Sequence, residues 1–164
     1  FKENIDAIIE YLRANFMKTI ILCLKKHQIK NFTKYLDLPY IIDDKEVFDG
    51  KMLLTAVGNG LCCGGGYYCL PKANVEDGLI DIVYVKTLSR FKFIGLVGKY
   101  KDGTYLGDSK YDKYMKYTTC KKIKLISEKP IAYSIDGECD LSNEININIE
   151  PKAINFVVPI EYEN

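Results

Sequence analysis

Two clusters of glycine and acidic residues are the part of this chain whose residue types could do chemistry. The first cluster contains, in order, Gly58-Asn59-Gly60, Gly64-Gly65-Gly66, Pro71-Lys72-Ala73 and Asp77-Gly78-Leu79-Ile80-Asp81. The second, shorter cluster is Ile135-Asp136-Gly137-Glu138, near the C-terminus. Glycine permits positive φ angles and a close approach of the backbone to a ligand. With acidic residues beside the glycines, the two clusters indicate a metal or a phosphate nearby.

The string Gly58-Asn59-Gly60 follows an apolar run, Met52–Val57, that predicts a buried strand. Glycines at the end of a strand let the backbone approach a ligand, and the amide of Asn59 can both donate and accept hydrogen bonds. Taken alone, the same string also fits an ordinary glycine turn or bulge. The triple glycine adds little to the choice, because such runs occur in ordinary loops.

The acidic turn at Asp77 and Gly78 predicts either a plain turn or a site for a hard cation. Mg²⁺ takes oxygen ligands at about 2.1 Å, often one carboxylate together with backbone carbonyls and waters. A tight acidic turn supplies this set, and Glu76 and Asp81 are close enough in sequence to contribute charge.

Asp136-Gly137 lies between two strand patterns and predicts a β-hairpin. The carboxylates of Asp136 and Glu138 flank the glycine, which crowds two like charges. Glu138 could accept a proton from a hydroxyl nucleophile that comes within about 3 Å of it. The alternative is a hairpin without a chemical role.

The elements that must position these clusters are mostly strands. Buried strands are predicted at Met52–Val57 and at residues 79–86, after an extended run at residues 32–42. Further strands are expected at residues 122–127, 131–135, 144–150 and 153–158. Apolar residues at helical spacing predict an amphipathic helix over about the first 25 residues; they are Ile5, Ile8, Ile9, Leu12, Phe16 and Ile20.

A second, shorter helix is predicted from Ser89, a plausible cap, to Tyr100, with Phe91, Ile94 and Val97 on one side. Many short strands with little helix predict a mainly β fold. We expect a two-sheet β-sandwich with an N-terminal amphipathic helix and one further short helix. The chain of 164 residues, 48% hydrophobic and 27% charged, is expected to form a single globular domain over residues 1–164.

Charge and cysteine content narrow the class of protein. The net charge of +1 argues neither for nor against nucleic acid. Lysines and tyrosines alternate over residues 99–124, which fits a surface for anionic lipid headgroups or phosphates, or a solvated loop and strand edge. The six cysteines lack the paired spacing of a zinc site, and reduced cysteines of a cytosolic protein are expected. The longest apolar run, Ile20–Leu24, is too short to span a bilayer, and no signal peptide is visible.

As an ordered set, the motifs resemble the C-terminal domain of the diacylglycerol kinase catalytic family, the bacterial soluble lipid kinases related to sphingosine kinases. In that family a strand runs into Gly-Asn-Gly, followed by a triple-glycine segment, a Pro-x-Ala step, an Asp-Gly-Leu-x-Asp turn and a later Asp-Gly-Glu hairpin. All stand here in that order, within residues 30–160. Each motif alone is unspecific, whereas the set is specific.

The resemblance implies roles for individual residues. Glu138 matches the residue that accepts the proton of the lipid hydroxyl, and Asp136 is the second candidate catalytic residue. Asp77 matches a ligand of Mg²⁺, and the backbone carbonyls of Asn74 and Leu79 complete that site. The remaining matched residues would face the nucleotide and the cleft; they are Gly58, Asn59 and Gly60.

The resemblance also implies the activity and the domain organisation of the full-length protein. That family transfers the γ-phosphate of ATP to a lipid hydroxyl, with diacylglycerol as the default substrate. Its nucleotide-binding domain, with a Gly-Gly-Asp-Gly-Thr signature, precedes this domain, and the signature is absent from the sequence. We therefore expect the C-terminal half of a two-domain lipid kinase, inactive alone, that is cytoplasmic and peripheral to the membrane. Its expected partners are a lipid substrate and, transiently, an anionic membrane surface. Binding to nucleic acid is not expected, and a homodimer is one of the oligomeric states that the sequence allows.

Two alternatives remain from the sequence. The same two-domain plan resembles NAD kinases, whose acceptor is a soluble dinucleotide. The other alternative is a non-catalytic β domain that binds a lipid or a partner protein. The intact Glu138 and Asp77 favour a working site.

Overall fold

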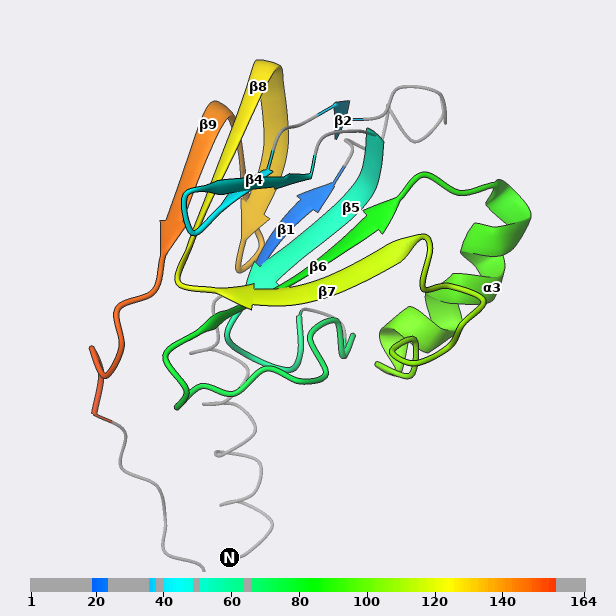
Figure 1. Ribbon diagram of the computed structural model, residues 1–164, viewed down its shortest axis with the longest axis horizontal. Coiled ribbons are helices and arrows are strands. Elements are labelled where there is room, and N and C mark those ends of the chain that lie inside the picture. Colours follow the sequence, from blue (N-terminus) through cyan, green and yellow to red (C-terminus); the bar gives the residue numbers. More distant parts are fainter. Residues whose placement is uncertain (1–18, 24–35, 38–39, 49–50, 64–65, 156–164) are drawn as a thin grey trace, which may run out of the picture.

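The computed structural model describes residues 19–23, 36–37, 40–48, 51–63 and 66–155 (Figure 1). The strands are β1 (Thr19–Cys23), β2 (Leu36–Asp37), β3 (Tyr40–Ile42), β4 (Lys45–Phe48), β5 (Lys51–Gly58), β6 (Ile80–Lys86), β7 (Met115–Cys120), β8 (Lys122–Ile135) and β9 (Glu138–Asn148). The helix among these residues is α3 (Arg90–Lys101).

The strands form one hydrogen-bonded ladder that folds into two layers. Its order is β4-β3-β8-β1-β5-β6-β7, with β2 added to β5 and β9 added to β8. Strand β1 pairs antiparallel with β5 on one side and with β8 on the other. The layer of β5, β6 and β7 therefore continues through β1 into the layer of β3, β4, β8 and β9.

A core of mostly aliphatic side chains fills the space between the two layers. Ile80, Ile82 and Tyr84 alternate along β6 and point into this sandwich core, as the two-residue period of a strand requires. Strand β8 contributes Ile123 and Ile131 from the opposite layer. The predicted mainly β sandwich is confirmed.

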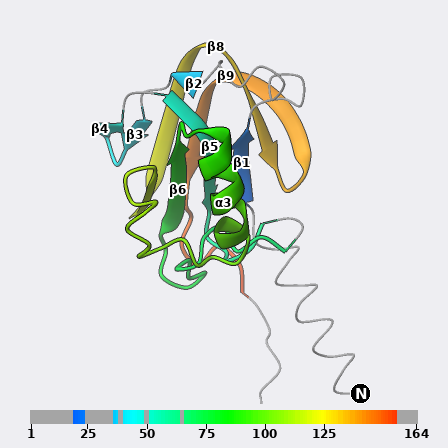
Figure 2. The same ribbon diagram turned by 90° about the vertical axis from the view of Figure 1, so that its right-hand side faces the viewer.

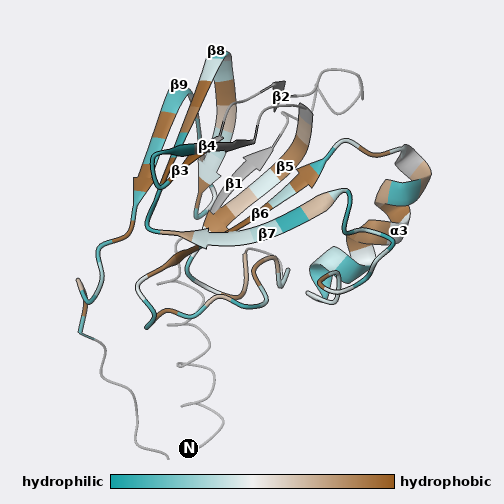
Figure 3. Ribbon diagram, in the orientation of Figure 1, coloured by the Kyte–Doolittle hydropathy of each residue, from teal (hydrophilic) through white to brown (hydrophobic). Residues whose placement is uncertain are grey.

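A second core lies on the outer face of β5 and β6, under α3. The intervening residues of β6, Val83 and Val85, belong to this helix-side core together with Leu96 of α3. Figure 2 shows α3 lying across this face of the sheet, and Figure 3 shows apolar residues on both the strands and the helix. Tyr105 and Tyr111, from the segment between α3 and β7, are also buried here.

The predicted short helix is confirmed, and Ser89 is its N-cap residue, although its side chain makes no capping hydrogen bond. Two of the residues expected on one side of this helix face outward, since Phe91 is 88% and Ile94 is 71% exposed. Leu96 instead anchors α3 to the sheet. This helix of 12 residues is short, and no helix in the described part of the chain has the length and hydrophobicity of a membrane span.

Three predictions of elements change. The predicted N-terminal helix lies outside the described residues up to residue 18, but residues 19–23 form β1, because this segment gains backbone pairing on both of its edges. The predicted strands 122–127 and 131–135 are one strand, β8, whose pairing with β9 shifts register between Ile126 and Ile131 and continues past Pro130. Residues 153–155 of the last predicted strand are not extended into the sheet, and the rest of it lies outside the described residues.

Candidate functional site

The first cluster lies at one end of the β5–β6 pair. Gly58 is the last residue of β5 and pairs directly with Asp81, near the start of β6. Asn59 and Gly60 follow Gly58 beyond the strand end. The acidic turn at Asp77 precedes β6 at the same end. The fold thus brings the two halves of the first cluster together.

The second cluster lies at the same end of the ladder. Val57 of β5 pairs with Ile20 of β1, Ile20 pairs with Ile135 of β8, and Ile135 pairs with Glu138 of β9. Neighbouring strands are about 4.8 Å apart, so three steps along this row give a separation of at most about 15 Å between the Cα atoms of Val57 and Glu138. The two clusters, distant in sequence, are therefore close in space.

The predicted hairpin is confirmed in detail. Asp136 has a φ of 49° and Gly137 a φ of 99°, the two consecutive positive φ angles of a two-residue turn that matches the twist of the flanking strands. Asp136, Gly137 and Glu138 are all exposed. Glu138 is therefore available to a molecule that approaches this end of the sheet.

The two clusters share an end of the sheet but not a face. Directly paired residues point to the same face, and successive residues alternate. Glu138 is in line with Val57, which belongs to the sandwich core, whereas Asp81 and Gly58 are on the face of Val83 and the helix-side core. Glu138 and Asp81 therefore lie on different faces at this end of the sheet.

The segment 74–79 closes a tight acidic turn. Asp77 Oδ1 accepts the backbone N–H of Leu79 at 2.8 Å, and Asn74 Oδ1 accepts the backbone N–H of Glu76 at 3.0 Å. Gly78 has a φ of 69°, which favours glycine, and a Cβ there would meet Pro151 at 3.3 Å. The turn brings Asn74, Asp77 and Leu79 into one short loop, while their role as metal ligands stays a prediction.

Asp81 is the buried carboxylate of this region. Its side chain is 1% exposed, and its Oδ1 accepts the hydroxyl of Tyr117 at 2.6 Å. The Tyr117 oxygen in turn accepts the backbone N–H of Lys72 at 3.3 Å. Within the described residues, Asp81 Oδ2 is buried without a hydrogen-bond partner.

The charge of Asp81 is unfavourable in the structure as it stands. Burial raises the pKa of Asp81 above its ordinary value, and the negative charge of Asp77 raises it further, while the hydrogen bond from Tyr117 opposes both. Burial also raises the pKa of Tyr117, and the bond to Asp81 adds to that effect. A nearby cation would relieve this accumulation of negative charge.

These residues fit a hydrated hard cation such as Mg²⁺. The described residues hold no group of three or more His, Cys, Asp or Glu side chains that could bind a metal. A site here would therefore use the carboxylate of Asp77, the backbone carbonyls of Asn74 and Leu79, and waters, which is a ligand set typical of Mg²⁺. The unpartnered oxygen of Asp81 is the observation that favours a cation nearby.

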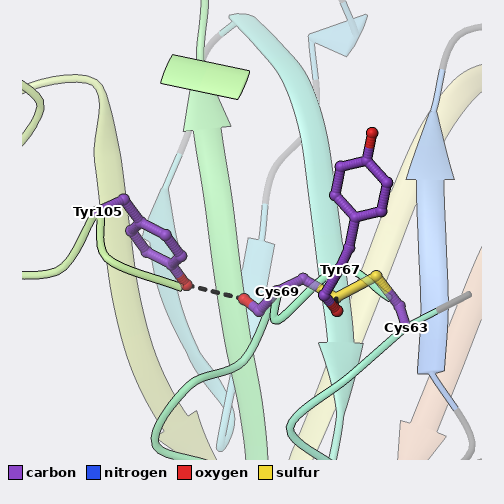
Figure 4. The surroundings of a disulfide bond; sticks show 4 residues. All are labelled: Cys63, Tyr67, Cys69 and Tyr105. Carbon is purple, nitrogen blue, oxygen red and sulfur yellow. Dashed lines mark hydrogen bonds between the residues drawn. A yellow bond between two sulfur atoms is a disulfide. The ribbon is translucent and has the colours of Figure 1, made fainter. Parts of the chain in front are cut away.

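A disulfide closes the glycine segment between the two halves of the first cluster. It joins Cys63 to Cys69, whose Cα atoms are 6.3 Å apart (Figure 4). The backbone N–H of Cys63 donates to the carbonyl of Tyr67 at 2.8 Å, which brings the arms of the loop together. The prediction that the cysteines are unpaired is wrong for these two, because the sequence does not reveal that the loop doubles back.

A cavity of about 180 Å³ lies between α3 and the outer face of the sheet. It is lined by Leu53, Leu54, Tyr67, Val85, Phe93, Leu96, Val97 and Tyr100. The hydroxyl of Tyr100 is buried and has no hydrogen-bond partner within the described residues. Leu54 and Gly58 alternate onto the same face of β5, so at about 3.3 Å per residue the cavity begins about 13 Å from the strand end.

Sequence reasoning missed two tyrosines whose hydroxyls fasten the backbone of the loops in this region. Tyr105 donates its hydroxyl to the carbonyl of Cys69 at 2.7 Å, as Figure 4 shows, and Tyr117 fastens Lys72. Both lie in the lysine- and tyrosine-rich segment, which was interpreted as a surface. The alternation of Met115 and Tyr117 around Lys116 is the signal that could have placed Tyr117 on the inner face of its strand.

Several lysines of that segment are engaged with their own chain. Lys99 forms an ion pair with Asp108 at 2.7 Å, and Lys110 lies 5.3 Å from the ring centre of Tyr111. These contacts within the chain explain part of the interleaving of lysine and tyrosine, so that part requires no external binding partner.

Comparison with known proteins agrees with the fold. The family model described as the YegS C-terminal NAD kinase beta sandwich-like domain matches residues 6–158. A protein of Shewanella frigidimarina named "Probable lipid kinase YegS-like" is 27% identical over 119 residues, which are 73% of this chain and 37% of that protein. One of the same name from Stenotrophomonas maltophilia is 24% identical over 112 residues, 68% of this chain and 35% of that protein.

The chain thus spans little more than a third of the length of these relatives. Among solved structures, a diacylglycerol kinase from Bacillus anthracis str. Sterne superposes with a TM-score of 0.57 at 19% identity, over 82% of this chain and 49% of that one. At this identity the likeness concerns the fold.

Proposed function

The chain belongs to the family of YegS C-terminal NAD kinase beta sandwich-like domains, and we propose that it is the C-terminal half of an ATP-dependent kinase that phosphorylates a lipid hydroxyl, with diacylglycerol as acceptor. The observation that carries the proposal is the strand register that gathers Gly58 and Glu138 at one end of the sheet. An upstream nucleotide-binding domain would form the other wall of the cleft, and this half alone would be inactive.

In this proposal Glu138 takes the proton of the lipid hydroxyl while the hydroxyl oxygen attacks the γ-phosphorus of ATP and ADP leaves. Asp136 is the second carboxylate of the hairpin, two residues before Glu138. Gly58, Asn59 and Gly60 line the cleft, where bare backbone permits close approach and the Asn59 amide offers hydrogen bonds.

The turn of Asn74, Asp77 and Leu79 would hold a Mg²⁺ ion that neutralises charge and stiffens the loop. Because Asp81 and Gly58 share a face that Glu138 does not, this ion would act on the structure of the site while Glu138 acts on the hydroxyl. Most of the charge neutralisation of the transferring phosphate would come from the upstream domain.

The motif set favours a lipid acceptor over a dinucleotide. The run from Pro71-x-Ala73 to Asp77-Gly78-Leu79-x-Asp81 and the Asp136-Gly137-Glu138 hairpin match the lipid branch. The enzyme would reach its substrate at the cytoplasmic surface of an anionic membrane, as a peripheral protein, without binding nucleic acid.

The test is a phosphotransfer assay on the full-length protein with labelled ATP and either diacylglycerol in mixed micelles or NAD. We expect label in the lipid, and a fall of at least about 100-fold in turnover for Glu138→Gln, because a positioned base contributes about 10²–10⁴. The matched control is Glu128→Gln, another exposed glutamate of the same chain, which should keep full activity.

Two outcomes would reject the proposal. Near wild-type turnover of Glu138→Gln, with an unchanged unfolding midpoint, would remove the role of this residue. Label in NAD instead of the lipid would point to the NAD kinase alternative, and vesicle binding without any phosphotransfer would point to a non-catalytic domain.

A further inference from the structure

The outer side of α3, which faces away from the sheet and toward the viewer in Figure 2, carries large apolar side chains. Phe91 is 88% and Ile94 is 71% exposed, and the two are neighbours on the helix surface because they are three residues apart. The inner side is apolar as well, since Phe93, Leu96 and Val97 line the cavity against the sheet. A helix that is hydrophobic on both sides is normally buried on both. Within the described residues, nothing buries Phe91 and Ile94.

The segment between α3 and β7 lies along the first half of the helix and adds lysines to this surface. Lys92 Nζ donates a hydrogen bond to the hydroxyl of Tyr114 and lies 4.8 Å from the centre of its ring. Lys113 Nζ lies 5.1 Å from the centre of the same ring. A Cβ at Gly95 would come within 3.0 Å of the Tyr111 hydroxyl. The two apolar side chains are therefore flanked by lysines from two separate elements.

The lysines at this surface leave an excess of positive charge. Lys92, Lys110 and Lys113 are exposed, and none of the ion pairs formed by the described residues includes them. Asp112 is the acidic residue between them in sequence, and the three lysines outnumber it. Residues 90–117 contain seven basic and three acidic residues, although the whole chain has a net charge of +1. This surface is therefore complementary to an anionic partner.

The combination of side chains distinguishes between kinds of partner. Lysine is depleted in protein–protein interfaces, so an apolar pair flanked by three lysines does not suit a protein partner. Helices that lie in the surface of an anionic membrane have this combination, because their apolar side chains enter the boundary of headgroups and acyl chains while lysines attract the headgroups. Tyrosine is enriched at the same boundary. The surface thus suits an anionic lipid bilayer.

Helix α3 connects this surface to the first cluster. The carbonyl of Lys101, the last residue of α3, accepts the backbone N–H of Tyr68 at 2.8 Å, and Tyr68 belongs to the loop that follows Gly60. Gly58 and Asp81 lie on the same face of the sheet as the helix-side core. A membrane in contact with α3 along its length would therefore lie near the end of the sheet that carries the first cluster.

We propose that the protein docks on anionic membranes through this surface, which we call the docking face and define as Phe91, Lys92, Ile94, Lys110 and Lys113. Phe91 and Ile94 enter the boundary of headgroups and acyl chains, and the three lysines bind the phosphates of the headgroups. The inference rests on the proposed function, because a lipid acceptor with long acyl chains is held in a membrane. It names the surface through which the enzyme meets that acceptor.

The first experiment measures co-sedimentation of the full-length protein with vesicles of phosphatidylcholine and phosphatidylglycerol. The apolar variant, Phe91→Gln with Ile94→Gln, should bind about 100-fold more weakly, because full burial of one such side chain corresponds to a factor of about 10 or more. The matched control is Ile154→Gln, which removes an isoleucine that is 65% exposed and lies outside the docking face. It should bind as wild type does.

The charge of the docking face is tested with the lysine variant, Lys110→Gln with Lys113→Gln. It should bind these vesicles about 25-fold more weakly and with a shallower salt dependence, because each basic residue near an anionic surface contributes a factor of about 5. Binding to pure phosphatidylcholine should be the same as that of wild type. Lys121→Gln, at an exposed lysine after β7, is the control and should keep wild-type affinity for both kinds of vesicle.

Phe91→Trp reports insertion directly, because these 164 residues contain no tryptophan. The emission that this variant gains over wild type should be quenched by vesicles whose acyl chains are brominated. In phosphotransfer assays the apolar variant should keep wild-type turnover on a water-soluble, short-chain diacylglycerol. Its turnover on long-chain diacylglycerol in vesicles should fall in parallel with binding.

Wild-type vesicle affinity in the apolar variant, or emission of Phe91→Trp that brominated lipid does not quench, would overturn the proposal. Unchanged affinity together with a shift from dimer to monomer would assign the face to a second copy of the chain instead. If the apolar variant fails to fold, wild-type affinity in the lysine variant overturns the proposal. Absence of lipid phosphorylation by wild type would reject the proposed function, whereas phosphorylation with unchanged vesicle binding in both variants would reject only the docking face.

Discussion

The 71–81 loop and the 135–138 hairpin lie at the same end of the sheet and are held in opposite ways. The loop is tied by side chains, since Tyr117 bonds Lys72 and Asp77 bonds the backbone of Leu79. The hairpin is exposed and owes its position to backbone register and two positive φ angles. A loop that is tied by its own chain can keep its geometry alone, whereas Glu138 needs an opposing surface to complete its surroundings.

The largest expected change in stability comes from the disulfide that leads into the loop. Cys63→Ser should lower the free energy of unfolding by about 2 kcal/mol, because the Cys63–Cys69 bond closes a short loop and so restricts the unfolded chain. Urea denaturation at equal protein concentration measures it. The cytosol, where we propose that the protein acts, keeps thiols reduced. Reduction of this bond there should lower the free energy of unfolding by about the same amount, about 2 kcal/mol.

The control for this change is Cys139→Ser, at an exposed cysteine on the hairpin side. It should leave the unfolding free energy unchanged. Equal losses from the two substitutions would contradict the idea that the loop, and not the hairpin, depends on cross-links of its own chain.

A smaller effect on stability, with a large one on activity, is expected for Gly137→Ala. Gly137 has a φ of 99° and a Cβ there would contact nothing within 4 Å, so the cost is conformational, roughly 1–2 kcal/mol. If register and turn geometry alone place Glu138, turnover should also fall, since a misplacement of about 1 Å can cost about 100-fold.

Gly107→Ala is the matched variant, because Gly107 has a φ of 82° and equally open space, far along the chain from both clusters. It should lose a similar free energy of unfolding and keep its turnover. If both variants lost activity in proportion to stability, the special dependence of Glu138 on the hairpin turn would be refuted.

The smallest expected effect concerns the ion pair on the arm of the hairpin. Lys124 Nζ is 2.8 Å from Glu144, and this bond, with that of Asn146, lowers the pKa of Glu144 below 4.5. A lowered folded-state pKa adds stability above the unfolded pKa, and this is lost as the pH falls through the folded pKa. Lys124→Met should therefore raise the pKa of Glu144 toward 4.5, with almost no change in stability at pH 7, because exposed pairs contribute little.

Carbon-detected NMR titration of the glutamate side chains measures this shift. Lys122 is on the same strand as Lys124 and pairs with Asp44 of the β3–β4 turn; Lys122→Met, which removes that ion pair, should leave the Glu144 titration unchanged. A marked destabilisation by Lys124→Met at pH 7 would mean that ion pairs, and not backbone register, hold the hairpin arm.

Local patterns allowed the sequence to predict the hairpin at Asp136-Gly137, strands β5 and β6, and helix α3. Each depends on signals within a few residues, such as positive φ at an Asp-Gly pair or an apolar run between turns. The positions of the clusters relative to each other depend on the pairing of β1 with both β5 and β8, which no local signal encodes.

The same limit explains what was missed at the candidate site. The bond between Tyr117 and Asp81 and the bond between Tyr105 and Cys69 each join residues 36 positions apart. From the sequence alone, a tyrosine in a lysine-rich segment is predicted to lie on the surface. In the structure, the sheet places these tyrosines against a buried carboxylate or carbonyl. The cavity under α3 likewise arises from residues of separate elements.

Strand β1 also has a consequence for how the protein is made. It is translated before the rest of this domain's sheet, yet Ile20 finds its partner Ile135 only after β8 has been translated. At about 5–20 residues per second on the ribosome, β1 must wait several seconds with the edge that pairs with β8 unpaired, and such edges invite aggregation. Contacts so distant along the chain also slow folding itself. Nascent chains of this domain should therefore depend on chaperones until the β8–β9 hairpin emerges.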